Sequence, residues 1–199
     1  MTGRFAPSPS GRMHLGNLWS CLLAWLAARS AGGGMVLRLE DLDPERCRQE
    51  YCDQVMRDLE WLGLDWDGRP VYQSRRTEAY AWAFQTLEKQ GRIYPCFCTR
   101  AERLAASAPH RSDGTAVYDG RCGRLFPAER EALFKVRRPA WRVRVPDEEI
   151  SFPDRLQGYF SEHLARDCGD FILRRSDGVY AYQMSVVVDD ACMGVTQVV

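Results

Sequence analysis

The stretch Arg4-Phe5-Ala6-Pro7-Ser8-Pro9-Ser10-Gly11-Arg12-Met13-His14-Leu15-Gly16-Asn17 decides the fold. Its first residues suit a short strand, its prolines and glycine predict an irregular turn, and the apolar run from Leu18 to Ala28 predicts a helix. This order places backbone N–H groups and the positive end of a helix where they stabilise a nucleotide phosphate. Gly16 lets a ligand approach the backbone closely, and His14 adds a donor. The alternative is a proline-rich arm with an incidental histidine.

The first 90 or so residues alternate between strand and helix patterns. The predicted elements are strands at residues 2–6 and 35–39 and helices at residues 18–28, 45–62 and 77–90. Pro44 suits the first turn of the second helix, and Gly63 and Gly91 suit helix ends. Strand–helix–strand order predicts an α/β fold with a parallel sheet that binds ligands at the carboxyl ends of its strands. The segment from Arg4 to Ser8 and Glu40 lie at two such ends.

The middle of the chain differs in composition, being rich in Pro, Gly, Arg and paired cysteines. We expect residues 1–92 to form the first half of a Rossmann-like domain, residues 93–155 an inserted α+β subdomain, and residues 156–199 the start of the second half. Short strand patterns occur at residues 141–145, 171–174 and 181–184. The chain stops within an apolar, strand-like run at Val198 and Val199, which suggests truncation.

Composition is compatible with a cytoplasmic protein. Hydrophobic residues make up 45% of the chain, no apolar run approaches membrane-spanning length, and the N-terminus lacks the layout of a secretory signal. The net charge of zero conceals a separation, because residues 38–67 carry ten acids and four bases, whereas residues 121–144 carry eight bases and two acids. The basic segment is either a solvated surface or a contact for a phosphate backbone.

Three of the eight cysteines are spaced as metal ligands: Cys96-x-Cys98 and, further along, Cys122. Three thiolates close together suit structural zinc, and the alternative is a group of buried free cysteines. The residues leave the fourth ligand open between His110, a frequent zinc ligand, and Tyr118, whose phenol must lose a proton. The remaining five cysteines are interpreted as packing residues.

The motif around His14 resembles the HIGH region of class I glutamyl-tRNA synthetases, and further landmarks of that family follow in order. They are Leu37–Asp43, Trp61–Asp67, Tyr72–Arg76, Tyr94–Cys98 and Tyr182–Val199. The resemblance implies a class I synthetase fold with a Rossmann-like parallel sheet and an inserted zinc-containing subdomain. It also implies activation of L-glutamate with ATP, with Mg²⁺ bridging the ATP phosphates.

The family's functional positions map onto named residues of this chain. His14, Gly16 and Asn17 match the ATP-site motif, and the glutamate positions match Arg4, Ala6, Ser8, Glu40 and Tyr182. Two departures stand out. Val186 replaces the asparagine that many members carry four residues after the tyrosine, and the second substrate arginine and the lysine-containing KMSKS loop would fall after Val199.

The spacing Cys96-x-Cys98…Tyr118-x3-Cys122 is similar to the zinc motif of short paralogues in this family, the glutamyl-Q tRNA(Asp) synthetases. This resemblance favours Tyr118 as the fourth ligand and implies transfer of glutamate to queuosine at the wobble position of tRNA(Asp). We expect a monomer without a membrane partner. The rivals are a fragment of an ordinary glutamyl-tRNA synthetase and a non-catalytic paralogue that binds nucleotide or RNA.

Overall fold

The computed structural model describes residues 1–99, 102, 108–109 and 116–199. The chain divides into two compact units, one formed by residues 1–83 with 184–199 and the other by residues 84–183. The predicted division of the chain into residues 1–92, 93–155 and 156–199 stays a prediction.

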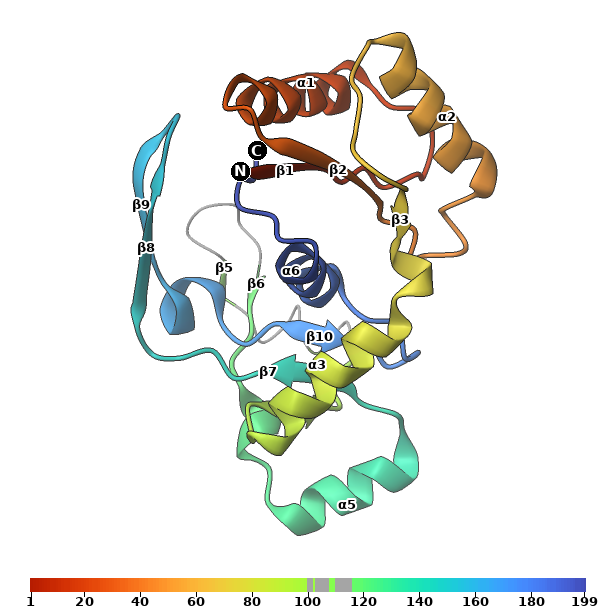
Figure 1. Cartoon of the computed structure of the whole chain (residues 1–199). Coiled ribbons are helices and arrows are strands. Elements are labelled where there is room, and N and C mark those ends of the chain that lie inside the picture. Colours follow the sequence, from red (N-terminus) through yellow and green to blue (C-terminus); the bar gives the residue numbers. More distant parts are fainter. Residues whose placement is uncertain (100–101, 103–107, 110–115) are drawn as a thin grey trace. The chain divides into compact units, whose positions relative to one another are not determined.

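The first unit is built on a parallel sheet in the order β1-β2-β3. Its elements are β1 (Thr2–Phe5), α1 (Leu15–Ser30), β2 (Gly34–Leu39), α2 (Gln49–Trp61), β3 (Val71–Tyr72), the 3₁₀ turn η1 (Gln73–Arg75), the start of α3 (Thr77–Lys89) and most of α6 (Tyr182–Cys192). Figure 1 shows α1 and α2 on one side of β1 and β2. The predicted α/β class with a parallel sheet is therefore confirmed.

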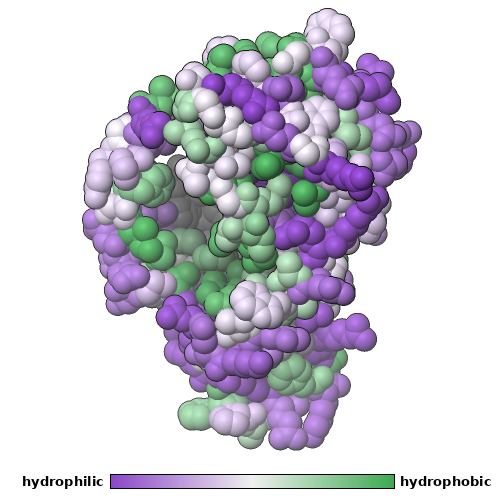
Figure 2. Space-filling view, viewed as in Figure 1, coloured by the Kyte–Doolittle hydropathy of each residue, from purple (hydrophilic) through white to green (hydrophobic). Residues whose placement is uncertain are grey.

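The core of this unit lies between the sheet and helices α1 and α2. The buried residues of α1 are Cys21, Ala24 and Ala28, and those of α2 are Cys52, Val55 and Leu59. Each set recurs at intervals of three and four residues, the spacing that gives a helix one apolar face. The opposite face of α2 is polar, and Figure 2 shows hydrophilic residues over this part of the surface.

Helix α1 approaches β1 closely at one glycine. A Cβ atom on Gly3 would lie 2.9 Å from the Cβ of Ala28, so the strand and the helix pack at a distance that only glycine permits. Phe5 is two residues further along the same strand and is buried in the same core. Because alternate residues of a strand point to opposite faces, Arg4 points away from α1.

The second unit contains a three-stranded antiparallel sheet in the order β10-β7-β4. These strands are β4 (Ile93–Cys96), β7 (Ala140–Val143) and β10 (Ile172–Arg174). The other elements are the hairpins β5 (Ala108–Pro109) with β6 (Ala116–Val117) and β8 (Glu149–Asp154) with β9 (Gly158–His163), the 3₁₀ turn η2 (Arg121–Arg124), helix α5 (Pro127–Val136) and the π-helical turn η3 (Leu164–Cys168).

Several predicted boundaries need correction. The helix expected from residue 45 begins at Gln49, so Pro44 is not in its first turn. Asp43 explains the delay, because its carbonyl accepts the N–H groups of Arg46 and Cys47 and closes a separate turn. Gly63, with φ of +73°, lies just past the end of α2 as predicted. The helix expected from residue 18 begins three residues earlier, at Leu15.

The largest error concerns the strand predicted at residues 181–184, because residues 182–184 begin helix α6 instead. The run Val186-Val187-Val188 favours a strand by intrinsic preference, yet the helix brings Asp189 into a buried polar network. Residues 195–199 form no strand either; the N–H groups of Thr196 and Gln197 donate to the carbonyl of Thr2. The strand predicted at 141–145 spans Ala140–Val143, and the strand at 171–174 is confirmed as β10.

Within the described residues, no helix is both long enough and apolar enough to cross a membrane.

The core of the first unit can be tested at Leu59, which is fully buried. Leu59→Ala leaves a cavity between α2 and the sheet, and we expect it to lower the free energy of unfolding by about 2–5 kcal/mol. Leu26→Ala is the matched control, since Leu26 is 46% exposed, and its cost should be far smaller. Urea unfolding followed by circular dichroism measures both variants. Equal costs would contradict the described core.

Candidate functional site

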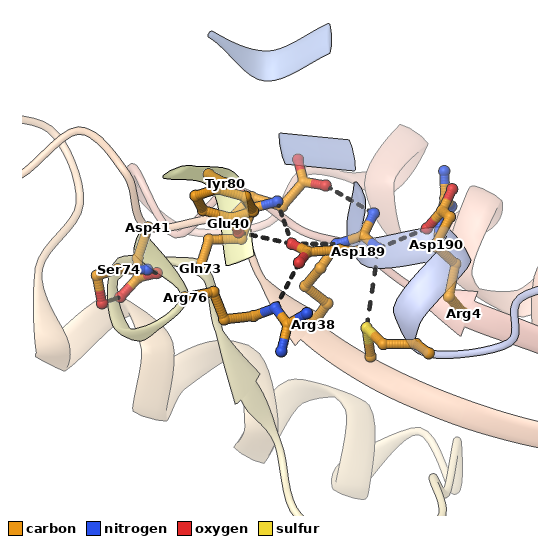
Figure 3. A network of polar contacts seen from close by, with 11 residues as sticks. Arg4, Arg38, Glu40, Asp41, Gln73, Ser74, Arg76, Tyr80, Asp189 and Asp190 are labelled. Atoms are coloured by element: carbon orange, nitrogen blue, oxygen red, sulfur yellow. Dashed lines mark hydrogen bonds and ion pairs between the residues drawn. The ribbon is translucent and has the colours of Figure 1, made fainter. Parts of the chain in front are cut away.

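The side chains of strand β2 point alternately to the two faces of the sheet, so its apolar residues lie on one face and its charged residues on the other. Leu37 and Leu39 are buried in the apolar core, and Arg38 and Glu40 point to the other face. Arg4 of β1 faces the same way. These three side chains form the start of a polar network at the carboxyl ends of the parallel strands, drawn in Figure 3.

Arg38 is the buried centre of this network, with no exposed side-chain surface. Its Nη2 lies 3.1 Å from Glu40 Oε1, and its Nη1 lies 2.5 Å from Asp190 Oδ1. Its Nε lies 3.9 Å from Asp189 Oδ2. An unpaired buried guanidinium is very costly, so these carboxylates are required to keep Arg38 inside the protein.

Asp189, on helix α6, is a second hub and is also fully buried. Its carboxylate accepts hydrogen bonds from Gln73 Nε2 at 2.9 Å and from the Tyr80 hydroxyl at 2.7 Å, and it forms an ion pair with Arg76. Burial, with this hydrogen bond as the next cause, raises the pKa of Tyr80 far above its ordinary value. Tyr80 therefore stays a neutral donor to Asp189. Figure 3 shows Asp189 between these partners and Arg38.

Two further contacts join the loops that follow the strands. The side chain of Asp41 accepts from the backbone N–H of Ser74 at 2.9 Å and from its hydroxyl at 2.6 Å. The N–H of Glu40 donates to the carbonyl of Pro7 at 3.0 Å. The segments after β1, β2 and β3 are thus tied to one another at the carboxyl edge of the sheet.

Arg4 and Glu40, both predicted to bind glutamate, already have partners inside the protein. Arg4 Nε lies 3.1 Å from Asp190 Oδ1, and Glu40 is held by Arg38. Burial raises the pKa of the Glu40 carboxyl, and the neighbouring positive charges of Arg38 and Arg4 oppose this rise. A further positive group beside Glu40, such as an ammonium, would favour its ionised form.

His14 occupies the N-cap of helix α1. Its Nδ1 accepts from the backbone N–H groups of Gly16 at 3.1 Å and Asn17 at 3.4 Å, and Asn17 Oδ1 accepts from the N–H of His14. Because Nδ1 is an acceptor, the neutral ring carries its proton on Nε2, which makes Nε2 a donor. The N–H groups of Gly16 and Asn17 thus already donate to His14, and the place of His14, Gly16 and Asn17 in an ATP site stays a prediction.

The other predicted glutamate residues are less enclosed. Ala6 is half-buried and Ser8 is exposed in the turn between β1 and α1. Tyr182 is the first residue of α6 and is 59% exposed. Val186 follows it by four residues, a spacing that puts both on one face of the helix.

The predicted metal ligands come together in the second unit. The sulfur atoms of Cys96, Cys98 and Cys122 all lie within 4.8 Å of one another, with Cys98 Sγ and Cys122 Sγ 3.4 Å apart. The Tyr118 hydroxyl lies 3.5 Å from Cys96 Sγ and 3.6 Å from Cys98 Sγ. His110, the alternative ligand, lies outside the described residues.

The electrostatics of this cluster favour one thiolate. Hydrogen bonding from Cys122 lowers the pKa of Cys96 to about 4, with help from Tyr118 and Arg142 and against the effect of burial. The pKa of Cys122 is raised, because Cys96 next to it takes the negative charge first, and burial raises the pKa of Tyr118. Of the three groups, Cys96 is thus the one whose ionised form the cluster stabilises.

Surrounding residues fix this arrangement. The guanidinium of Arg142 stacks over the Tyr118 ring at 3.8 Å, and Arg142 also donates to the carbonyl of Asp170. The Tyr94 hydroxyl donates to the side chain of Asp170 at 2.5 Å. The N–H of Cys122 donates to the Tyr118 hydroxyl at 3.1 Å. Arg142 thus holds the ring of Tyr118, and the N–H of Cys122 holds its hydroxyl.

Much of the basic segment at 121–144 is used for such internal contacts. Arg142 is buried, Arg130 and Arg144 both donate to the carbonyl of Gly123, and Arg121 pairs with Asp119. Fewer of its guanidinium N–H groups are therefore left for a phosphate backbone than the sequence suggests, and Asp119 neutralises one of its charges.

Sequence reasoning missed the buried centre of the first site. The sequence motifs contain Arg38, Asp189 and Asp190 but assign them no role, and they assign no role to Gln73 or Tyr80 either. A charged residue between two apolar ones in a short strand, as in Leu37-Arg38-Leu39, is the signal that would have found Arg38. Nothing in the sequence pairs it with residues 150 positions later.

A parallel sheet, a strand–turn–helix segment with a histidine cap, and charged residues at the carboxyl ends of the strands define an α/β domain of the nucleotide-binding class. The family model for tRNA synthetases class I (E and Q), catalytic domain, matches residues 1–199. The chain belongs to this family.

Relatives are similar over the whole chain. It is 52% identical over 207 residues to the glutamyl-Q tRNA(Asp) synthetase of Nitratidesulfovibrio vulgaris and 49% identical over 210 residues to that of Symbiobacterium thermophilum, covering 99% and 100% of this chain. The chain spans 64% of the length of each. A crystal structure of a glutamate tRNA ligase from Elizabethkingia meningosepticum, in complex with its amino acid, aligns with a TM-score of 0.84 and 29% identity, covering 100% of this chain and 43% of that one.

The network can be tested at Asp189. Asp189→Asn removes the charge that faces Arg76 and Arg38 in a buried environment, and we expect it to lower the free energy of unfolding by about 3–5 kcal/mol. The control is Asp177→Asn, which breaks an ion pair whose side chains are 53% and 47% exposed. It should cost less than about 1 kcal/mol. Urea unfolding measures both, and similar costs would argue against the network.

Proposed function

We propose that this protein activates L-glutamate with ATP and transfers the activated glutamate to queuosine at the wobble position of tRNA(Asp). The observation that carries the first half is the placement of Arg4 and Glu40, a cation and an anion joined to one buried network at the carboxyl edge of a parallel sheet. An amino acid carries the complementary pair of charges.

In the first step a carboxylate oxygen of glutamate attacks the α-phosphorus of ATP. A new P–O bond forms, the bond to the β-phosphate oxygen breaks, and pyrophosphate leaves with glutamyl-adenylate as product. Arg4 holds a carboxylate of the substrate, and Glu40 accepts from its ammonium group. His14 Nε2–H donates to a phosphate oxygen. Mg²⁺ would supply positive charge that neutralises part of the charge of the ATP phosphates.

The protein contributes mainly by positioning and by fixed charges in this step. Ala6 and Ser8 line the turn beside Arg4, where a small side chain leaves room for the substrate. Tyr182 supplies a hydroxyl to the substrate's side-chain carboxylate. Gly16 and Asn17 act through His14, because their N–H groups hold its ring by Nδ1.

In the second step a nucleophile on the queuosine base attacks the activated carbonyl, and AMP leaves. The acceptor is inferred from the names of the relatives, from the Tyr118-x3-Cys122 spacing and from Val186. Val186 offers no hydrogen bond where an asparagine would offer several. The second candidate is charging of the 3′ end of tRNA(Glu), favoured by the structural likeness to a glutamate tRNA ligase. A non-catalytic nucleotide- or RNA-binding role is the third.

We further propose that Cys96, Cys98, Cys122 and Tyr118 hold one structural zinc ion. In a tetrahedron with Zn–S bonds of about 2.3 Å and a Zn–O bond of about 2.0 Å, the S···S edges are about 3.8 Å and the O···S edges about 3.5 Å. The distances of 3.4 Å between Cys98 Sγ and Cys122 Sγ and of 3.5 and 3.6 Å from the Tyr118 hydroxyl are close to these edges. The residues fit the ion.

Zinc binding is tested by metal analysis of protein purified without chelators, where we expect one zinc per chain. Cys98→Ser should reduce the zinc content strongly, because it removes a thiolate ligand. Cys47→Ser is the control, since Cys47 is half-buried outside the cluster, and should leave the content unchanged. Tyr118→Phe should weaken zinc retention more than His110→Ala. No zinc in the wild-type protein would end the proposal, and the reverse order of the last two variants would assign the fourth ligand to His110.

The activity is tested on the full-length natural protein with labelled glutamate and ATP. We expect label on queuosine-containing tRNA(Asp), and activation of glutamate before any tRNA is added. Arg4→Ala and Glu40→Ala should each reduce glutamate-dependent ATP–pyrophosphate exchange by orders of magnitude, because each leaves a substrate charge unpaired.

Arg155→Ala, an exposed change on the β8–β9 hairpin, is the control for these variants and should keep the rate. Label on the terminal adenosine of tRNA(Glu) would instead identify the ordinary synthetase.

A further inference from the structure

Four side chains of alternating charge form a continuous line through the first unit: Arg4, Asp190, Arg38 and Glu40. Successive charged atoms are 3.1, 2.5 and 3.1 Å apart. The four residues come from three elements, since Arg4 is on β1, Arg38 and Glu40 are at the end of β2, and Asp190 is on α6. Figure 3 shows Asp190 between Arg4 and Arg38.

The four side chains differ in exposure. That of Arg38 is 0% exposed, whereas those of Glu40, Arg4 and Asp190 are 5%, 10% and 19% exposed. The inner residues have all their charge partners within the protein. Asp190 is more exposed than the two ends, but its carboxylate already pairs with the guanidinium groups of both Arg4 and Arg38.

Each end residue uses one atom for the line and keeps others free. Arg4 is bound through Nε, and within the described residues its two terminal nitrogens have no hydrogen-bond partner. Glu40 is bound through Oε1, which leaves Oε2. The hydrogen bonds within the line therefore fix the orientation of both side chains. They leave the terminal nitrogens of Arg4 for a carboxylate and Oε2 of Glu40 for an ammonium group.

We propose that Arg38 and Asp190 are positioning residues that set the distance and orientation between Arg4 and Glu40, and so select a ligand carrying both an ammonium and a carboxylate group. This inference rests on the proposed function, because it specifies how that site recognises its amino acid. Arg38 and Asp190 contact no substrate. They act by holding the two residues that do, so that less rotamer freedom is lost when the ligand binds.

Asp67 provides a matched comparison in the same unit. It accepts from the N–H of Met35 at 2.7 Å and pairs with Arg29 at 3.0 Å. Met35 lies at the beginning of β2, so this pair is at the amino ends of the parallel strands, opposite the carboxyl ends where Arg4 and Glu40 lie. Asp67→Asn therefore breaks an ion pair of the same type without touching Arg4 or Glu40. A merely structural role for Asp190 predicts that both variants behave alike.

The experiment measures the Kd for L-glutamate, for glutarate (which lacks the ammonium group) and for ATP on the full-length protein by titration calorimetry. Asp190→Asn and Arg38→Gln should each weaken glutamate binding by about 10- to 100-fold, the scale of effect expected for misplaced binding groups, with an unchanged Kd for ATP. Both should also reduce the preference for glutamate over glutarate, because Glu40 is no longer held. Asp67→Asn should change none of these values.

If Arg38→Gln does not fold, Asp190→Asn and the conservative Arg38→Lys carry the test. Arg38→Lys retains the charge but cannot reach two carboxylates at once, so it should fall between the wild type and Arg38→Gln. Unchanged glutamate affinity and unchanged preference over glutarate in a folded Asp190→Asn protein would overturn the proposal, as would equal effects of Asp67→Asn.

A second measurement separates this proposal from the proposed function. In NMR spectra of the protein without ligand, Asp190→Asn should shift both the Arg4 Nε–H signal and, through Arg38, the Glu40 carboxylate carbon signal, and Asp67→Asn should shift neither. If the wild-type protein does not bind glutamate, the proposed function fails. These shifts still decide whether Arg38 and Asp190 fix the orientation of Arg4 and Glu40. Shifts confined to Arg4 would overturn it.

Discussion

The first unit depends on the burial of one guanidinium group. Arg38 has no exposed side-chain surface, and a buried cation is tolerated only when carboxylates neutralise it. Glu40 follows it on the same strand, but Asp189 and Asp190 come from a helix some 150 residues later. The charge on one strand therefore requires the end of the chain to fold back onto the sheet.

A single strand supplies both the core and the site. Leu37 and Leu39 pack under α1 and α2, and Arg38, between them, faces the charged network. Because the side chains of a strand alternate, the apolar packing that fixes the strand also fixes the direction of Arg38. Disturbance of the core would therefore move the site.

The sequence predicted what depends on local spacing. The sheet, α1 and α2 followed from apolar periodicity, and Cys96, Cys98 and Cys122 followed from their separation. Helix α6 was missed because Val186, Val187 and Val188 prefer strands, and the helix is stabilised by what Asp189 contacts. The pairing of Arg4 with Asp190 was equally invisible, because it joins residues 186 positions apart.

The charges of the network explain what it can and cannot hold. Three cations (Arg4, Arg38 and Arg76) balance three anions (Glu40, Asp189 and Asp190), so the unliganded cluster is neutral. Glutamate brings one ammonium and two carboxylates. Glu40 and Arg4 match the ammonium and one carboxylate, and the remaining carboxylate needs another donor to avoid an unpaired charge. Under the proposed function, recognition of both carboxylates of glutamate therefore requires a donor besides Arg4.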